Sequence, residues 1–174
     1  GYIDSEKMFD IVMKWDWVNS GSPDIYHDLE TRKNSISYRT NLIRLTETLI
    51  NENRLGKAEK VIDLAMEKMP LEYFGYYTLV EPFANAYYTI GQKEKGRDIL
   101  TKLIVKQQEV LTFYNGLKPS DQNFSAMDIL QDIEQYRKLL YIAKNGNDLD
   151  FYNKEKPKFN NYNKMFIRFG RKME

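Results

Sequence analysis

Two stretches of the chain carry the same pattern of apolar residues, 38 residues apart. In each stretch an apolar helical face leads to a turn residue, Asn53 or Gly91, and a second apolar helix follows. The first stretch carries Leu42, Leu45, Thr46, Leu49, Asn53, Ala58, Ile62, Ala65 and Pro70, and the second carries Val80, Phe83, Ala84, Tyr87, Gly91, Gly96, Leu100 and Leu103. Helix pairs that recur at a fixed period bury their apolar faces against one another in a stack. With no strand pattern elsewhere, the sequence predicts an all-α fold.

The first helical hairpin is expected to consist of a helix over 31–52 and a helix over 55–69. Pro70 ends the second helix because proline lacks an N–H and clashes with the preceding turn. Asn53 lies where the hairpin needs a left-handed residue, and asparagine tolerates that conformation better than most residues. Such a unit is TPR-like, that is, similar to a tetratricopeptide repeat.

The second hairpin departs from the first because Pro82 falls within its first helix. The helix is therefore expected either to kink at Pro82 or to begin near it. Its second helix is expected over 92–114, and a break follows at 115–120. A further helix over 125–144 is expected to cap an α-α superhelix of TPR-like helical hairpins, since terminal repeats are often atypical.

The sequence suggests three parts: an N-terminal arm (1–30) packed on the body, a TPR-like repeat domain (31–145), and a basic, aromatic C-terminal tail (146–174) of capping helices. The arm is expected to begin with a helix over 4–14. Trp15 and Trp17 follow it, and a role in fastening the arm to the body is favoured over the alternative of ligand binding.

The tail differs in composition from the rest of the chain. From Lys144 onward there are eight Lys or Arg and four Asp or Glu, a net charge of +4, with aromatic residues interleaved. Pro157 is expected to split the tail into two short helices. A terminal helix docked on the repeats is favoured over nucleic-acid binding, and contact with a membrane surface is the second alternative.

The residues offer no evident catalytic or metal-binding constellation. The chain has no cysteine, and its one histidine, His27, is expected to be an ordinary surface residue. Acidic residues alternate with Lys and Arg at helical spacing, which is typical of a solvated helix face. The net charge of +1 gives no field that would favour nucleic acid. We therefore expect this chain not to be an enzyme and to need neither cofactor nor metal.

A ligand of stacked hairpins is expected on the inner surface formed by the first helix of each hairpin. The candidate groove residues are Thr40, Ile43, Glu47, Thr78, Glu81, Asn85 and Tyr88. Because this surface has two glutamates and no Lys or Arg, it is unsuited to a peptide carboxylate. A neutral, basic or glycan-like ligand would suit it better, and an inner face covered by the N-terminal arm is the equal alternative.

Five segments together carry a family resemblance: Tyr2–Asp10, Arg39–Leu45, Lys57–Asp63, Met69–Pro70 and Ala84–Tyr88. They resemble the C-terminal soluble region of the Bacteroidetes DUF2723 proteins, large membrane proteins related to protein O-mannosyltransferase-like glycosyltransferases. The resemblance covers most of residues 2–145 and weakens in the tail.

The resemblance implies that this chain is part of a longer protein, whose membrane-spanning region would come first and hold the glycosyl-transfer site. The helical region would lie on the periplasmic side of the inner membrane. No catalytic residue of that family matches a position here. We therefore expect a non-catalytic protein-interaction domain that recruits an acceptor protein or an assembly partner. A free-standing protein–protein adaptor and a carbohydrate-binding domain are the alternatives.

Overall fold

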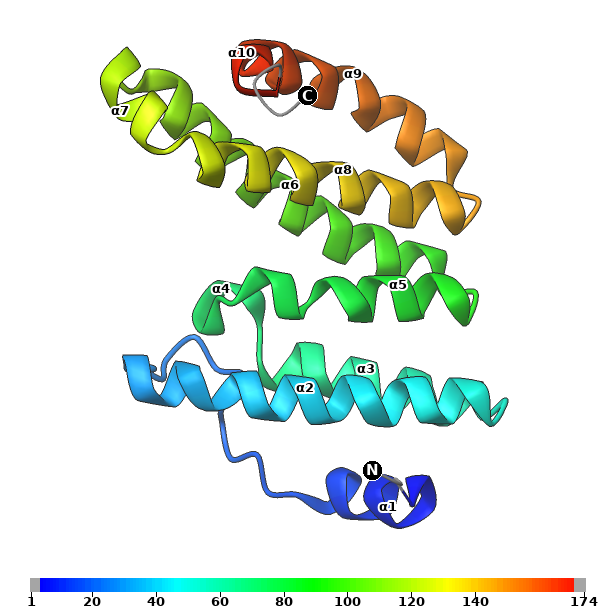
Figure 1. Ribbon diagram of the computed structural model, residues 1–174. Coiled ribbons are helices and arrows are strands. Elements are labelled where there is room, and N and C mark those ends of the chain that lie inside the picture. Colours follow the sequence, from blue (N-terminus) through cyan, green and yellow to red (C-terminus); the bar gives the residue numbers. More distant parts are fainter. Residues whose placement is uncertain (1–3, 171–174) are drawn as a thin grey trace. The chain divides into compact units, whose positions relative to one another are not determined.

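The computed structural model describes residues 4–170, and every element among them is a helix (Figure 1). The expected all-α class is therefore confirmed for this part of the chain. The chain forms two compact units, Gly1–Gln92 and Lys93–Glu174, and each is described by itself. The expected division into arm, repeats and tail follows other boundaries and stays a prediction.

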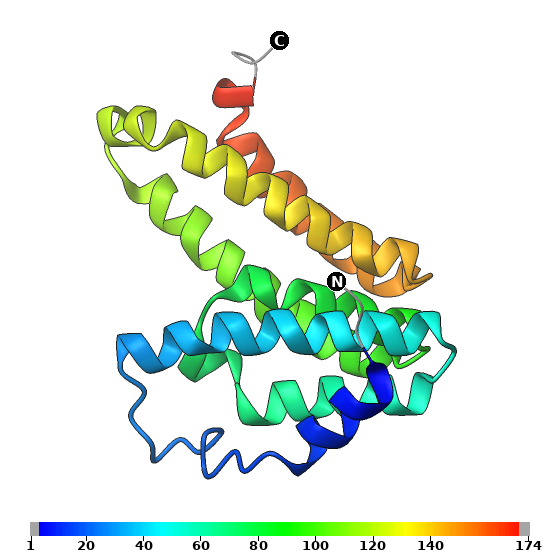
Figure 2. The same ribbon diagram turned by 60° about the horizontal axis from the view of Figure 1, so that its bottom comes forward.

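The first unit is built on an antiparallel helical hairpin (Figures 1 and 2). Its elements are α1 (Ser5–Lys14), α2 (Leu29–Asn51), α3 (Leu55–Lys68), α4 (Leu71–Phe74), the 3-10 helix η1 (Tyr77–Leu79) and α5 (Glu81–Thr89). Both α1 and α5 pack against α2 and α3. Helix α5 begins at Glu81 and has Pro82 in its first turn, so the second of the two expectations for that proline is correct.

The turn between α2 and α3 has the conformation expected for Asn53, with φ of 58°. Its N–H donates to the carbonyl of Ile50 at 2.9 Å, and the next N–H, from Arg54, donates to the carbonyl of Leu49 at 2.8 Å. This is the Schellman motif, which satisfies the last carbonyls of a helix. Gly91, with φ of 83°, ends α5 by the same pair of bonds.

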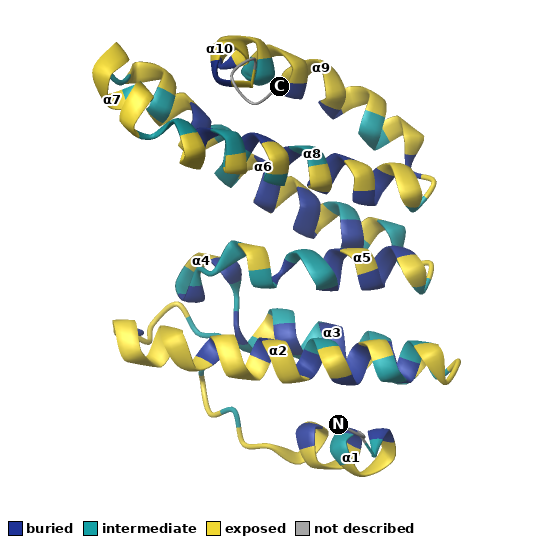
Figure 3. Ribbon diagram, in the orientation of Figure 1, coloured by how far each residue is buried: buried dark blue, intermediate teal, exposed yellow. Residues whose placement is uncertain are grey.

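Helices α2 and α3 pack closely through small side chains. Leu42, Leu45 and Leu49 of α2 are fully buried, as are Ala58 and Ala65 of α3 (Figure 3). Alanine on one helix lets its backbone approach the larger side chains of the other, and each buried leucine contributes about 1.5–3 kcal/mol of transfer free energy.

One charged residue, Arg39, lies on this apolar face and is fully buried. Its Nη2 donates to the carbonyl of Met69 at 2.8 Å, and its Nη1 donates to the carbonyl of Gly75 at 2.6 Å. Met69 and Gly75 are the C-caps of α3 and α4. Burial lowers the pKa of Arg39 to about 10, so the guanidinium stays charged at neutral pH. A single cation thus satisfies carbonyls at the ends of two helices.

The described part of the second unit, residues 93–170, consists of three long helices and two short ones. They are α6 (Lys93–Gly116), α7 (Pro119–Phe124), α8 (Ala126–Asn145), α9 (Leu149–Met165) and α10 (Ile167–Gly170). Helix α8 packs against both α6 and α9. Tyr136 lies fully buried in the centre of this unit, where its hydroxyl accepts a hydrogen bond from Gln108 at 2.7 Å and its ring contacts Phe159 edge-on.

The expectation that Pro157 splits the tail is wrong, because α9 continues through it. Pro157 is exposed, whereas Glu155 and Phe159 on either side of it are buried. The carbonyl of Asn153, which loses its helical partner, belongs to an exposed residue of α9, where this loss costs less than in the core. Packing of the opposite side against α8 keeps the helix continuous.

We predict that Arg39→Ala lowers the free energy of unfolding by about 2–4 kcal/mol, because it removes the donors to the buried carbonyl of Met69 and the part-buried carbonyl of Gly75 and leaves a cavity. Urea denaturation followed by circular dichroism measures the loss. Arg44→Ala, an exposed change on the same helix, is the matched control and should change stability by no more than about 0.5 kcal/mol. Equal effects of the two substitutions would contradict this role of Arg39.

We predict that Pro157→Ala raises the free energy of unfolding by about 1–3 kcal/mol, since it restores a helical hydrogen bond and removes a clash. The control is Asn153→Ala, an exposed change one turn earlier in α9 that gains helix propensity alone. If both variants gain the same amount in thermal denaturation, the proline does not strain α9.

Candidate functional site

The residues expected to form a groove all lie in the first unit, and the structure gives them different exposures. Thr40, Glu47, Thr78 and Asn85 are exposed, Ile43 and Glu81 are half-buried, and Tyr88 is buried. Helices α2 and α5, which carry most of them, are neighbours. Tyr88 belongs to the packed side of α5 and offers little surface to a ligand. The groove as a binding site stays a prediction.

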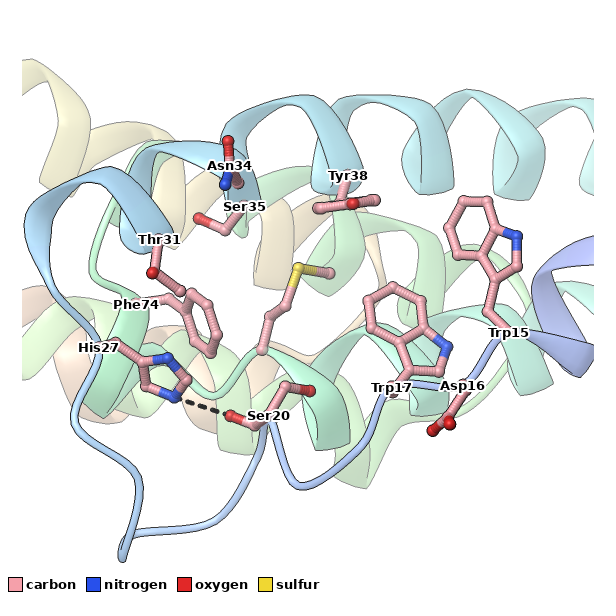
Figure 4. A pocket seen from close by; sticks show the side chains of 11 residues that line it. Trp15, Asp16, Trp17, Ser20, His27, Thr31, Asn34, Ser35, Tyr38 and Phe74 are labelled. Carbon is pink, nitrogen blue, oxygen red and sulfur yellow. Dashed lines mark hydrogen bonds between the residues drawn. The ribbon is translucent and has the colours of Figure 1, made fainter.

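The structure has a cavity elsewhere in the first unit, between the arm and the first half of α2. Its volume is about 440 Å³. The residues that line it are Trp15, Asp16, Trp17, Ser20, His27, Thr31, Asn34, Ser35, Tyr38, Met69 and Phe74 (Figure 4). Cavities of roughly 300–1,000 Å³ with mixed aromatic and polar walls are typical ligand sites.

Three aromatic rings form one wall. The rings of Trp15 and Trp17 lie 5.4 Å apart, and each meets the ring of Tyr38 on α2, at 5.8 Å and 5.7 Å. These contacts confirm the expectation that the two tryptophans fasten the arm to the body. The rings are mutually tilted and touch one another, so no cation fits among the three.

His27 was expected on the surface, and this expectation is wrong: only 5% of it is exposed. Its ring lies 4.4 Å from the ring of Phe74, and its Nε2 lies 2.9 Å from the carbonyl oxygen of Ser20. Because a carbonyl only accepts, Nε2 carries the hydrogen of this bond. The polar neighbours of His27 in the sequence suggested exposure, but the arm folds back and covers it.

The arm comes very close to the end of α3 at this point. Ser20 donates its hydroxyl hydrogen to the carbonyl of Lys68 at 2.9 Å. A Cβ at Gly21 would lie 2.1 Å from the carbonyl oxygen of Glu67, so only glycine fits there. These contacts hold the arm segment 20–27 against the end of α3, and Ser20 and His27 of this segment line the cavity.

The polar groups of the cavity differ in whether they already form hydrogen bonds to other described residues. Ser35 donates to the carbonyl of Arg32, and the hydroxyl of Thr31 bonds to Asp28. Neither the Asn34 amide nor the Tyr38 hydroxyl has a hydrogen bond to another described residue. The indole N–H of Trp17 is buried and also lacks an acceptor within the described part of the chain.

The lining has little charge. Asp16 is its one carboxylate, and it contains no Lys or Arg. Arg39 is not among the lining residues, and its guanidinium binds the backbone carbonyls of Met69 and Gly75. The cavity therefore suits a neutral ligand with both flat apolar faces and hydrogen-bonding groups.

One carboxyl group of the second unit has a raised pKa. Burial and the nearby Asp128 raise the pKa of Asp132 on α8, while a hydrogen bond from Gln107 opposes this. No group of three His, Asp or Glu side chains that could hold a metal ion occurs within residues 4–170.

Comparison with protein-family models, curated proteins and solved structures finds no match to this chain. Among the helices of residues 4–170, none combines the length and the apolar character required to cross a membrane.

Sequence patterns could have indicated part of this site. Arg39 occupies the same helical stripe as Ser35, Leu42 and Thr46, all buried, so its spacing already placed it on the packed face. The lining residues of the arm have no such periodicity, because they lie in a loop. Their convergence with α2 depends on how the arm returns.

We predict that His27→Ala loosens the arm, since it removes the ring contact with Phe74 and the bond to Ser20. Cleavage of the loop 15–28 by a protease present in limiting amount should accelerate at least about threefold. Tyr26→Ala is the control because Tyr26, the neighbouring residue, is 85% exposed. Equal cleavage of the His27→Ala variant and the unchanged protein would show that His27 does not hold the arm.

Proposed function

We propose that this chain is a non-catalytic, TPR-like protein-interaction domain that recruits an acceptor polypeptide or an assembly partner. The observation that carries the proposal is an accumulation of exposed apolar side chains on the arm and the first half of α2. These residues, here called the arm surface, are Ile11, Met13, Trp15, Val18, Ile25, Tyr26, Leu29, Ile36 and Tyr38.

The arm surface has the composition of a protein interface. Val18 is 75% exposed and Tyr26 is 85% exposed, although most of each side chain is apolar. Concentrated apolar exposure marks interaction sites on soluble domains, and aromatic residues and methionine are enriched at the centre of interfaces. Val18 also has a positive φ of 48°, an uncommon backbone conformation for a β-branched residue, as often found at functional sites.

The expected groove is a second part of the proposal. Thr40 and Glu47 lie farther along α2 from the arm surface, on the same helix, and Thr78 and Asn85 belong to the neighbouring segment of the unit. A partner polypeptide that binds the arm surface and continues along α2 would reach them. The partner is a protein or peptide; we do not propose nucleic acid.

The family resemblance supports a specific setting. In that setting the domain belongs to a membrane glycosyltransferase-like protein of the DUF2723 type and lies on the periplasmic side of the inner membrane. The alternative is a free-standing adaptor without a link to glycosylation. The reading frame upstream of this chain distinguishes the two alternatives. A domain of a membrane glycosyltransferase-like protein requires that hydrophobic spans of about 20 residues be encoded there.

Photo-crosslinking tests the arm surface directly. A benzophenone amino acid at position 26 should crosslink a polypeptide from an envelope extract of the source organism, whereas the same group at position 124 should not. Phe124 is the matched control, since it is apolar and 93% exposed but lies in the second unit.

The double variant Val18→Asp, Tyr26→Asp should reduce capture of the crosslinked protein at least tenfold, because two charges are placed in an apolar interface. Phe124→Asp should leave capture unchanged. The proposal fails if position 26 captures nothing, or if deletion of the domain in the native protein leaves both glycosylation and complex assembly intact.

A further inference from the structure

We infer that the cavity between the arm and α2 is a binding site for a neutral sugar in its pyranose form. This goes beyond the proposed protein interaction, because it concerns the cavity lined by Trp15, Asn34 and Tyr38 and assigns a small carbohydrate to it. The inference is based on the size, the aromatic wall, the free polar groups and the charge of that cavity.

The size and the aromatic wall suit a sugar ring. About 440 Å³ accommodates one or two hexose units, in the usual range of ligand sites. Trp15 is 39% exposed and Tyr38 is 44% exposed, so neither side chain is fully covered by the rest of the unit. The face of an aromatic ring carries partial negative charge, which attracts the C–H bonds on the apolar side of a pyranose.

The polar groups argue for a hydroxylated ligand over an apolar one. Within residues 4–170, the Asn34 amide and the Tyr38 hydroxyl form no hydrogen bond to another residue, and the Trp17 indole N–H lacks an acceptor. An aromatic side chain inserted here would desolvate these groups and return no hydrogen bonds, which is costly. Sugar hydroxyls both donate and accept, so they can match an amide, a phenol and an indole N–H at once.

The charge of the lining disfavours an anion, which would find Asp16 and no Lys or Arg. A cation finds no space among the three rings, because they contact one another. A neutral ligand avoids the repulsion by Asp16 and does not need to enter between the rings.

The chain has two tryptophans, Trp15 and Trp17, and both line the cavity. Intrinsic tryptophan fluorescence therefore reports on this site alone. We would titrate the intact chain with the methyl glycosides of glucose, mannose, galactose and N-acetylglucosamine. At least one should give a saturable change in emission, with a Kd between about 0.1 and 10 mM, the range of a few hydrogen bonds and one stacked ring.

Saturation-transfer NMR gives a second readout, since the C–H protons on one face of the bound sugar should receive most of the transfer. Asn34→Ala keeps both tryptophans and should weaken binding about three- to tenfold, the loss of one or two hydrogen bonds. Asn41→Ala, an exposed asparagine on the same helix outside the cavity, is the matched control and should leave the Kd unchanged.

N-acetylphenylalaninamide and methyl phosphate test the rival ligand classes. The inference is overturned if no glycoside gives saturation at about 50 mM, if either rival compound saturates the signal and the glycosides do not, or if Asn41→Ala weakens binding as much as Asn34→Ala. The Val18→Asp, Tyr26→Asp variant should bind sugar normally, so failure of the protein interaction and failure of the sugar site are separately visible.

Discussion

The first unit depends on the contact between one buried cation and the ends of two helices. Peptide carbonyls at a helix C-terminus lack partners, and Arg39 supplies donors to Met69 at the end of α3 and to Gly75 at the end of α4. The planar guanidinium donates to two carbonyls in different segments. A lysine ammonium could not donate to both with the same geometry. The contact thereby fixes where the chain leaves α3 and brings Met69 and Phe74 to the cavity wall.

The second unit joins its helices by a related device. Asp148, the N-cap of α9, is buried and receives two hydrogen bonds from Arg97 of α6, at 2.5 Å and 2.6 Å. The turn before it repeats the geometry of the α2–α3 turn, with Asn147 at φ of 54° and the same pair of carbonyl bonds. In each unit, a charge at a helix end and a left-handed turn residue determine how successive helices meet.

Helix positions were largely predictable from the sequence, because apolar periodicity and turn residues are local signals. The expected helix over 31–52 corresponds to α2, and Asn53 adopts the expected conformation. The prediction that Pro157 splits the tail was wrong because the rule that proline breaks a helix does not consider which side of the helix is exposed. The cavity was not predictable: the burial of His27 and the meeting of Trp17 with α2 arise from a loop that folds back, and no local pattern encodes that path.

The arm passes so close to the end of α3 that it restricts which residue can occupy position 21. At position 21 there is no room for even a methyl group, because the carbonyl oxygen of Glu67 already occupies that space. Exposed neighbours such as Asn19 and Pro23 carry no such restriction. Homologous chains that retain the same loop path should therefore show glycine at this position even where the surrounding loop has diverged, and loss of that glycine would mark lineages in which the loop has taken another route.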